Sequence, residues 1–401
     1  MTQNTSAGTA GRDVDELHRR IERLSGFLAQ DNGNEMLRRD LFDALLAAKD
    51  FARAMATAEE ALLAPPGGAG WIYRRAIAAR LAGQPTEAVA ALRGLAEGGV
   101  NEPSVIIELA RAELDAGETG SAIDRLQQLD LTALEPTLAE QAAVVLLPAL
   151  MGRGQLDQLI AVSQAFLTKH PQAARVMGIL GSAYVDANRI SDARALVQAA
   201  RQHGISEPNL DAVAGFVALD AADIGTARRD FASSLRQAPG AGRAHLGMGL
   251  VEAYENRLDA ARAAFERAVA AMPTHLGSWH ALAWVNLLAD DVDAAEQAFL
   301  QALDKDRNFG DTYGGLAVIA ARRGDRNAAQ EHIRTGKRLD RFSVNVGVAE
   351  AMLAQHGDLR DPGTLARAFE MFQERALARS PLMQASFARL MSKKLKNEPR
   401  H

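Results

Sequence analysis

Two stretches of the sequence share one pattern of small and large side chains. "DAARAAFERAVAAMP" occupies residues 259–273, and "DAAEQAFLQALDKDR" occupies residues 293–307. In each stretch an alanine is followed by a phenylalanine four residues later and by a second alanine after three more, a spacing that places all three on one face of a helix. The second set lies 34 residues after the first. The two sets are Ala261, Phe265 and Ala268, and Ala295, Phe299 and Ala302.

A unit of 34 residues repeats along most of the chain. With Phe265 counted as position 24, consecutive units start at Ala174, Pro208, Gly242, Leu276 and Gly310. Position 20 is alanine in all five: Ala193, Ala227, Ala261, Ala295 and Ala329. Upstream, units start at Glu35, Ala69 and Pro103, and a degenerate unit starts at Glu140 after three inserted residues, 137–139. Nine units therefore cover residues 35–343.

Residues that end helices recur at fixed positions of the unit and predict a pair of helices. Position 15 is often glycine or asparagine, which tolerate the left-handed conformation that ends a helix. Proline recurs at position 32 and stops the second helix. Small residues at positions 8 and 20 allow the two helices to approach closely. Since one hairpin cannot bury its apolar face alone, the units are expected to stack.

The unit resembles the tetratricopeptide repeat family. The residues that carry the resemblance best lie in the unit at 276–309: Trp279, Leu282, Ala283, Ala295, Phe299 and Ala302. The resemblance implies an all-α fold, a right-handed α-solenoid of about nine to ten helical hairpins with terminal capping helices. Asn286 departs from the family pattern, in which tyrosine is usual at that position.

The repeat frame divides the chain into seven segments, with a bend expected near Pro148, which lies inside the first helix of the degenerate unit and should kink it. The expected segments are a disordered N-terminus (1–12), an N-terminal capping helix (13–34), units 1–3 (35–136), the insertion with degenerate unit 4 (137–173), units 5–9 (174–343), a divergent tenth hairpin (344–380), and a C-terminal helix with a basic tail (381–401).

Composition argues against several classes of function. The net charge is −5 with mixed charges, so nothing indicates nucleic-acid binding. The chain has no cysteine, which excludes disulfides and thiolate zinc sites. Its most apolar run, residues 142–151, is too short for membrane insertion, and the N-terminus lacks the apolar core of a signal peptide. We therefore expect a cytoplasmic protein, and the Ala/Arg/Gly-rich composition points weakly to bacteria.

Motifs for catalysis are absent from the sequence. There is no P-loop, no GxSxG and no HExxH, and the carboxylates are spread over outer helix positions. His275 and His280 are five residues apart and diverge on a helix, which does not suit a shared metal ion. We expect no enzymatic activity, no cofactor and no metal site.

The resemblance implies that the first helices line a concave surface, with ligand contacts from positions 2, 5, 9, 12 and 13. An apolar ladder occupies these positions in the central units and suggests a partner-binding groove for a peptide or an amphipathic helix. Its residues are Phe216, Leu250, Trp284 and Val318 at position 9, with Tyr254, His280 and Leu287 beside them. The alternative interpretation is that these residues belong to the core between hairpins. The Lys and Asn pattern of family members that clamp a C-terminal carboxylate is missing. A second, more polar surface is expected near the N-terminus from Arg39, Asp43, Arg74, Arg80, Glu108 and Arg111.

These observations favour a non-enzymatic scaffold or adaptor that binds peptide or helical segments of protein partners in its concave groove. Similar proteins serve bacterial envelope, secretion or exopolysaccharide assembly, a context suggested by analogy alone. One alternative is a regulator whose superhelix changes shape when it binds a peptide or a small molecule. Another is an enzyme with an unrecognised site. The partner, the pathway and the oligomeric state are left open by the sequence.

Overall fold

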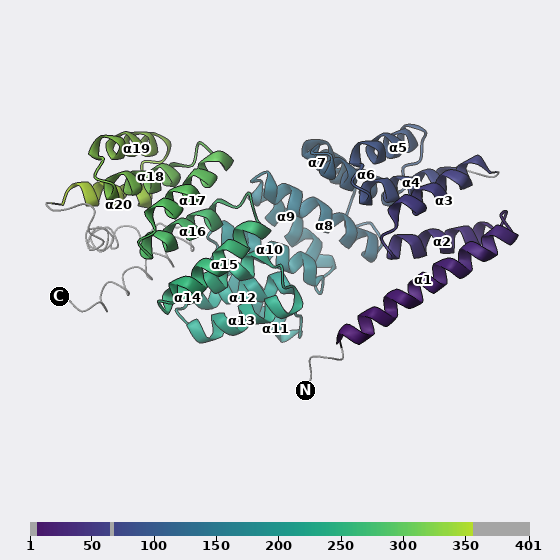
Figure 1. The fold of residues 1–401 in the computed structure, drawn as a ribbon, viewed down its shortest axis with the longest axis horizontal. Coiled ribbons are helices and arrows are strands. Elements are labelled where there is room, and N and C mark those ends of the chain that lie inside the picture. Colours follow the sequence, from purple (N-terminus) through teal and green to yellow (C-terminus); the bar gives the residue numbers. More distant parts are fainter. Residues whose placement is uncertain (1–5, 65–67, 356–401) are drawn as a thin grey trace. The chain divides into compact units, whose positions relative to one another are not determined.

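The computed structural model describes residues 6–64 and 68–355, with side chains from residue 15 onward, and every regular element in these ranges is an α-helix (Figure 1). Helix α1 (Ser6–Gln30) comes first, and pairs of helices follow it. The first helices of the pairs are α2 (Glu35–Ala47), α4 (Ala69–Leu81), α6 (Pro103–Asp115), α8 (Pro136–Gly152), α10 (Ala174–Asp186), α12 (Pro208–Asp220), α14 (Gly242–Tyr254), α16 (Leu276–Leu288), α18 (Gly310–Arg322) and α20 (Val344–Leu353). The second helices are α3 (Phe51–Leu63), α5 (Pro85–Glu97), α7 (Thr119–Gln127), α9 (Leu156–Lys169), α11 (Ile190–Gln202), α13 (Ile224–Gln237), α15 (Leu258–Ala271), α17 (Val292–Lys305) and α19 (Arg326–Leu339).

The chain divides into two compact units, residues 1–158 (unit 1) and 159–401 (unit 2). The boundary falls inside α9, within the segment 137–173 that the sequence singles out as degenerate. From α1 to α8 in unit 1 and from α10 to α20 in unit 2, each helix packs against the next one along the chain, as α4 does against α5 and α14 against α15. Each unit is thus a stack of helical hairpins.

The 34-residue frame predicts where the first helices begin. In eight of the nine repeats the first helix starts at the residue that the frame gives, from Glu35 in α2 to Gly310 in α18. The exception is α8, which starts at Pro136 and not at Glu140. The three inserted residues extend its N-terminal end, while its last residue, Gly152, keeps the usual position 13. The helix also continues past Pro148.

A left-handed residue separates the two helices of every repeat. The φ angle at position 15 lies between 56° and 83° in all nine hairpins. At Gly83, for example, the amide donates to the carbonyl of Arg80 at 3.0 Å, and the next amide, of Gln84, donates to Ala79 at 2.9 Å. These bonds satisfy carbonyls that the helix end leaves open. Lys49, Ala222 and Asp290 take the same conformation without being glycine or asparagine.

Phenylalanine at position 24 fills the space between helices. Phe231, Phe265 and Phe299 are fully buried. Their rings lie against glycines of the first helices, so closely that a Cβ atom built on Gly249 would be 2.4 Å from Cε1 of Phe265. The small and large positions of the repeat therefore fit together as the sequence predicts.

Helix α1 packs on the first hairpin through Ile21 and Leu28, which share a buried cluster with Phe42 of α2. It begins at Ser6, so residues 6–12, expected to be disordered, are helical instead. Lengthening an existing helix adds one hydrogen bond per residue without a new nucleus, which explains the extension. At the other end α20 begins at Val344, where the tenth hairpin is expected. The rest of that hairpin and the segment 381–401 lie outside the described residues.

Candidate binding groove

The apolar ladder is buried in unit 2. The side chains of Phe216, Leu250, His280, Trp284, Leu287 and Val318 are at most 8% exposed, and Tyr254 is half-buried. The exposed apolar stripe that the sequence suggested is therefore not present on these residues. The burial agrees with the alternative interpretation, in which position 9 belongs to the core.

Aromatic contacts explain this burial. The ring of Phe216 lies 5.1 Å from that of Phe231 on the following helix, in an edge-on arrangement. Trp284 meets Phe299 in the same way at 5.8 Å. Since position 9 is one residue from position 8, where the second helix approaches, a large side chain there turns into the hairpin. A partner-binding role for the ladder remains a prediction.

His280 is buried, His275 is half-buried, and both imidazoles are neutral. Burial lowers the pKa of each imidazole to about 4. Nε2 of His280 lies 2.9 Å from the hydroxyl of Thr312, and Nδ1 of His275 accepts the amide hydrogen of Ser278 at the start of α16. The two rings thus have separate structural contacts. Among the described residues no group of three or more histidine or carboxylate side chains is arranged to hold a metal ion.

Three of the six charged residues expected near the N-terminus meet in unit 1. Arg80 of α4 donates through Nε to Oε1 of Glu108 at 2.6 Å, and Arg111 donates through Nη1 to Oε2 at 3.1 Å. Arg80 also reaches Asp115 through Nη1 at 3.1 Å. The Glu108 side chain is only 4% exposed, so both its oxygens are committed to these two arginines.

The network favours the charged form of Arg80. Burial alone would lower the pKa of Arg80, but the nearby carboxylates of Glu108 and Asp115 outweigh it and raise the pKa. The remaining predicted residues lie elsewhere. Arg39 pairs with Glu35 on its own helix, Arg74 lies over the ring of Trp71, and Asp43 is exposed.

A cavity of about 480 Å³ opens beside the network. Its lining comes from the first helices of three consecutive hairpins, α4, α6 and α8, and from the start of α7. The residues are Arg80, Arg111, Leu114, Asp115, Thr119, Val144, Val145, Pro148, Ala149, Gly152 and Arg153. We call this cavity the unit 1 groove. It uses positions 5, 9, 12 and 13 of the repeat, as the resemblance implies for a ligand surface.

The α8 side of the groove was missed by reasoning from the sequence. Val144, Pro148 and Gly152 occupy positions 5, 9 and 13 of the degenerate unit, and Arg153 follows them at the end of α8. The repeat frame holds from Glu140 and so could have identified these residues. The second helix of that unit has Leu159 at position 20 and Ser163 at position 24, so the unit as a whole matches the repeat pattern weakly.

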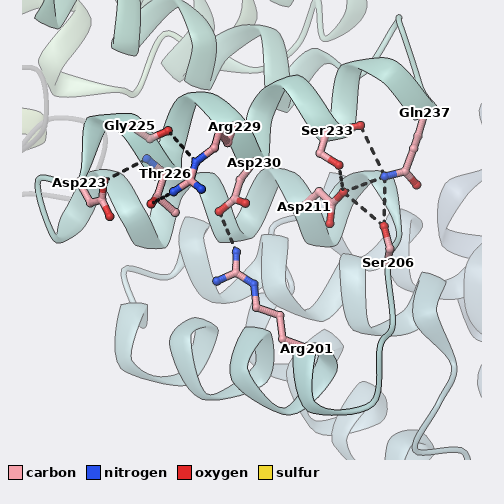
Figure 2. A network of polar contacts seen from close by, with 10 residues as sticks. All are labelled: Arg201, Ser206, Asp211, Asp223, Gly225, Thr226, Arg229, Asp230, Ser233 and Gln237. Atoms are coloured by element: carbon pink, nitrogen blue, oxygen red, sulfur yellow. Dashed lines mark hydrogen bonds and ion pairs between the residues drawn. The ribbon is translucent and has the colours of Figure 1, made fainter.

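A separate polar network joins α11, α12 and α13 in unit 2 (Figure 2). Asp211 accepts hydrogen bonds from Ser233 at 2.8 Å and from Gln237 at 2.7 Å. Asp230 pairs with Arg201 of the preceding hairpin at 2.8 Å, and burial raises the pKa of Asp230. Figure 2 shows these side chains bridging neighbouring helices. The network therefore holds hairpins together.

Several solved structures are similar to this chain in fold. The Cut9–Hcn1 hetero-tetramer of the APC/C is similar over 94% of this chain and 82% of its own, with a TM-score of 0.56 and 14% identity. A monomeric mutant of IFIT1 with Gppp-AAAA covers 90% of both chains, with a TM-score of 0.54 and 12% identity. A tetratricopeptide repeat protein from Parabacteroides merdae is 15% identical over 59% of this chain and 93% of its own, with a TM-score of 0.41. No curated protein sequence matches the chain.

Fold and groove together define the class: an all-α protein of stacked helical hairpins, of the α-solenoid type. The family model for the tetratricopeptide repeat matches residues 146–208 and 214–275. These stretches are tetratricopeptide repeats, and the same 34-residue hairpin extends on both sides of them. Within the described residues no helix is both long and apolar enough to cross a membrane.

Proposed function

We propose that the chain is a non-catalytic interaction scaffold and that the unit 1 groove holds a segment of a partner protein. The observation that carries this proposal is the cavity itself, whose lining is drawn from the first helices of three consecutive hairpins. Tetratricopeptide repeats support protein binding as a general role. We assign that role to the groove in this chain.

The size and lining of the groove suit a short peptide segment. A volume of about 480 Å³ lies in the range of pockets that hold several residues or a small ligand. Arg80, Arg111 and Arg153 are among the lining residues, and Val144, Val145 and Pro148 supply apolar surface. Sites of this kind bind through the apolar contacts and set the orientation of the ligand through the polar ones.

The finer assignments remain part of the proposal. We place the protein in the cytoplasm, in a bacterial assembly of envelope, secretion or exopolysaccharide machinery, by analogy with similar proteins. We keep a ligand-gated regulator as the second candidate, because the division into two units falls inside the segment 137–173. A ligand-dependent change in the radius of gyration in solution would favour this second role.

Pro148 offers a clean way to test the groove. It is exposed, lines the cavity and lies inside a helix, where proline costs stability. Pro148→Trp therefore blocks the groove without endangering the fold. We propose affinity purification from native lysate with quantitative mass spectrometry, using the wild-type chain and this variant.

Two controls separate blocking from other effects. Pro148→Ala removes the proline but leaves the groove open, so its partners should match those of the wild type. Asp124→Trp places the same indole on an exposed site of α7, outside the groove lining. Partners lost from Pro148→Trp and kept by both controls support the proposal. Identical partner sets for all four proteins would refute the groove as the binding surface.

A further inference from the structure

We infer that the unit 1 groove selects a peptide segment in which an aspartate or glutamate side chain stands beside an apolar one, with the carboxylate bound by Arg153 and Arg111. This inference rests on the proposed function and adds the chemistry of the partner. It follows from the donors that the groove leaves open, from the acceptors that it has already used, and from its apolar wall.

The open donors come from two arginines. Arg153 is exposed, lines the cavity, and has no side-chain hydrogen bond or ion pair with the described part of the chain. Arg111 uses only Nη1, on Glu108, and its side chain is 31% exposed. Its Nε and Nη2 are therefore left for a ligand. A planar guanidinium with free N–H groups matches the two oxygens of a carboxylate.

The groove offers few acceptors to a ligand. Both oxygens of Glu108 are occupied by Arg80 and Arg111, and the side chain is closed to solvent. Asp115 is half exposed but already accepts from Arg80. Around the cavity the guanidinium groups thus outnumber the carboxylates, although the whole chain carries a net charge of −5. A basic segment would meet repulsion here, and an acidic one would be attracted.

The apolar wall sets the second requirement. Val144 and Pro148 lie one helical turn apart on α8, and Leu114 of α6 lines the same cavity. An apolar side chain next to the carboxylate would bury surface against this wall, which a free phosphate or a purely polar acid would not. The wall therefore favours a protein segment over a nucleic acid, whose phosphates need several unpaired cations.

Arg80 and Glu108 act as positioning residues in this arrangement. The buried carboxylate of Glu108 accepts a hydrogen bond from Arg111, which lies one turn later on the same helix. Fixing one guanidinium nitrogen reduces the freedom that a ligand must remove on binding.

The test uses a phage-displayed library of random twelve-residue peptides, selected on the full-length protein. Each peptide is fused to the coat protein through its C-terminus, so only side-chain carboxylates are presented. Selected clones are sorted by loss of binding to Pro148→Trp, with Pro148→Ala as control. The best groove-dependent peptide is then synthesised, labelled with fluorescein and titrated by fluorescence polarisation.

We expect groove-dependent clones to be enriched in aspartate or glutamate next to leucine, isoleucine, valine or phenylalanine. Both Arg153→Gln and the change of the peptide carboxylate to an amide should weaken binding about ten-fold or more. Combining the two changes should cost less than the sum of the two separate costs, because both remove the contact between Arg153 and the carboxylate. Arg39→Gln, outside the groove, should leave affinity unchanged.

The outcomes separate two kinds of failure. Groove-dependent clones that are neutral or basic, or an unchanged affinity for Arg153→Gln, overturn the carboxylate assignment while the groove stands. A selection in which no clone depends on Pro148 overturns the groove and with it the inference. If phosphorylated or nucleic-acid ligands displace the peptide from the wild type but not from Arg153→Gln, the carboxylate assignment is wrong and the site binds phosphate.

Discussion

Asp186 and Arg243 form a two-pronged ion pair between hairpins that are not neighbours in the chain. Nη1 of Arg243 donates to Oδ1 of Asp186 at 2.8 Å, and Nη2 donates to Oδ2. Asp186 is the last residue of α10 and Arg243 the second of α14, so the pair joins two first helices that are separated in the sequence by the hairpin of α12 and α13. Both side chains are largely shielded from solvent. The pair therefore holds α10 and α14 together.

Replacing Asp186 by alanine should destabilise unit 2. The change removes two charge-assisted hydrogen bonds from a partly buried arginine, for an expected loss of roughly 1–3 kcal/mol in the free energy of unfolding. Urea denaturation measures the loss, and hydrogen exchange should locate it in α10 and α14. Asp304→Ala breaks an exposed pair with Lys305 and should change nothing measurable. Equal stability of the two variants would show that the pair is not a structural tie.

Two glycines in helices should respond to alanine with opposite signs. A Cβ at Gly249 meets the buried ring of Phe265, so Gly249→Ala should cost roughly 1–3 kcal/mol through overpacking. Gly94 in α5 is exposed, and a Cβ there meets no other atom within 4 Å. Gly94→Ala should therefore stabilise the protein by up to about 1 kcal/mol through helix propensity. Thermal unfolding of both variants checks the contrast, and a stabilising Gly249→Ala would contradict the packing described.

Acid should weaken the fold through His280. Burial lowers the pKa of this imidazole from 6.5 to about 4. Between these two pH values the imidazole is therefore protonated in the unfolded chain but neutral in the folded one. The stability of the wild type is thus full above pH 6.5 and falls as the pH drops toward 4, by about 3 kcal/mol from this residue. His280→Gln should lose that much less between pH 7 and pH 4 in urea titrations. Parallel pH profiles of the two proteins would mean that folding does not lower the pKa of His280.

Trp284 should behave as a core residue. The sequence analysis placed Trp284 in a partner-binding groove, where its replacement would affect binding more than stability. Its side chain is instead 4% exposed and packed on Phe299, so Trp284→Ala should cost roughly 3–5 kcal/mol, as Phe265→Ala should. Chemical denaturation of the two variants compares these costs. A Trp284→Ala protein as stable as the wild type would restore the exposed-anchor interpretation.

The repeat frame predicts the helices because helix ends are local features. The turn at position 15 belongs to a single hairpin, and the large residue at position 24 repeats the same contacts in each unit, as Phe231 does with Gly215 of its own hairpin and Gly247 of the next. The starts from Glu35 to Gly310 follow from that frame alone. The start of α8 does not, because the inserted residues 137–139 could equally have lengthened a loop. Ala222 shows a further limit, since its left-handed φ is imposed by the hairpin and not by its side chain.

The site is harder to predict because it depends on how neighbouring hairpins cover each other. Position 9 borders both the groove and the core. It is buried at Phe216 and Trp284 in unit 2, whereas Pro148 at the same position is exposed in unit 1. Composition cannot distinguish these cases. The pairing of Arg80 with Glu108 joins residues of successive repeats, and it becomes visible only when the repeats are stacked.

The most direct test of the unit 1 groove is site-specific photo-crosslinking. A benzophenone amino acid is placed at position 148 in one protein and at position 124, on the exposed face of α7, in another. Both are irradiated in native lysate, and the joined peptides are identified by mass spectrometry. The groove predicts that position 148 captures one defined segment, acidic and apolar, which position 124 does not capture and which excess of its synthetic peptide displaces. Capture of the same proteins at both positions, undiminished by the peptide, would contradict a partner site in the groove.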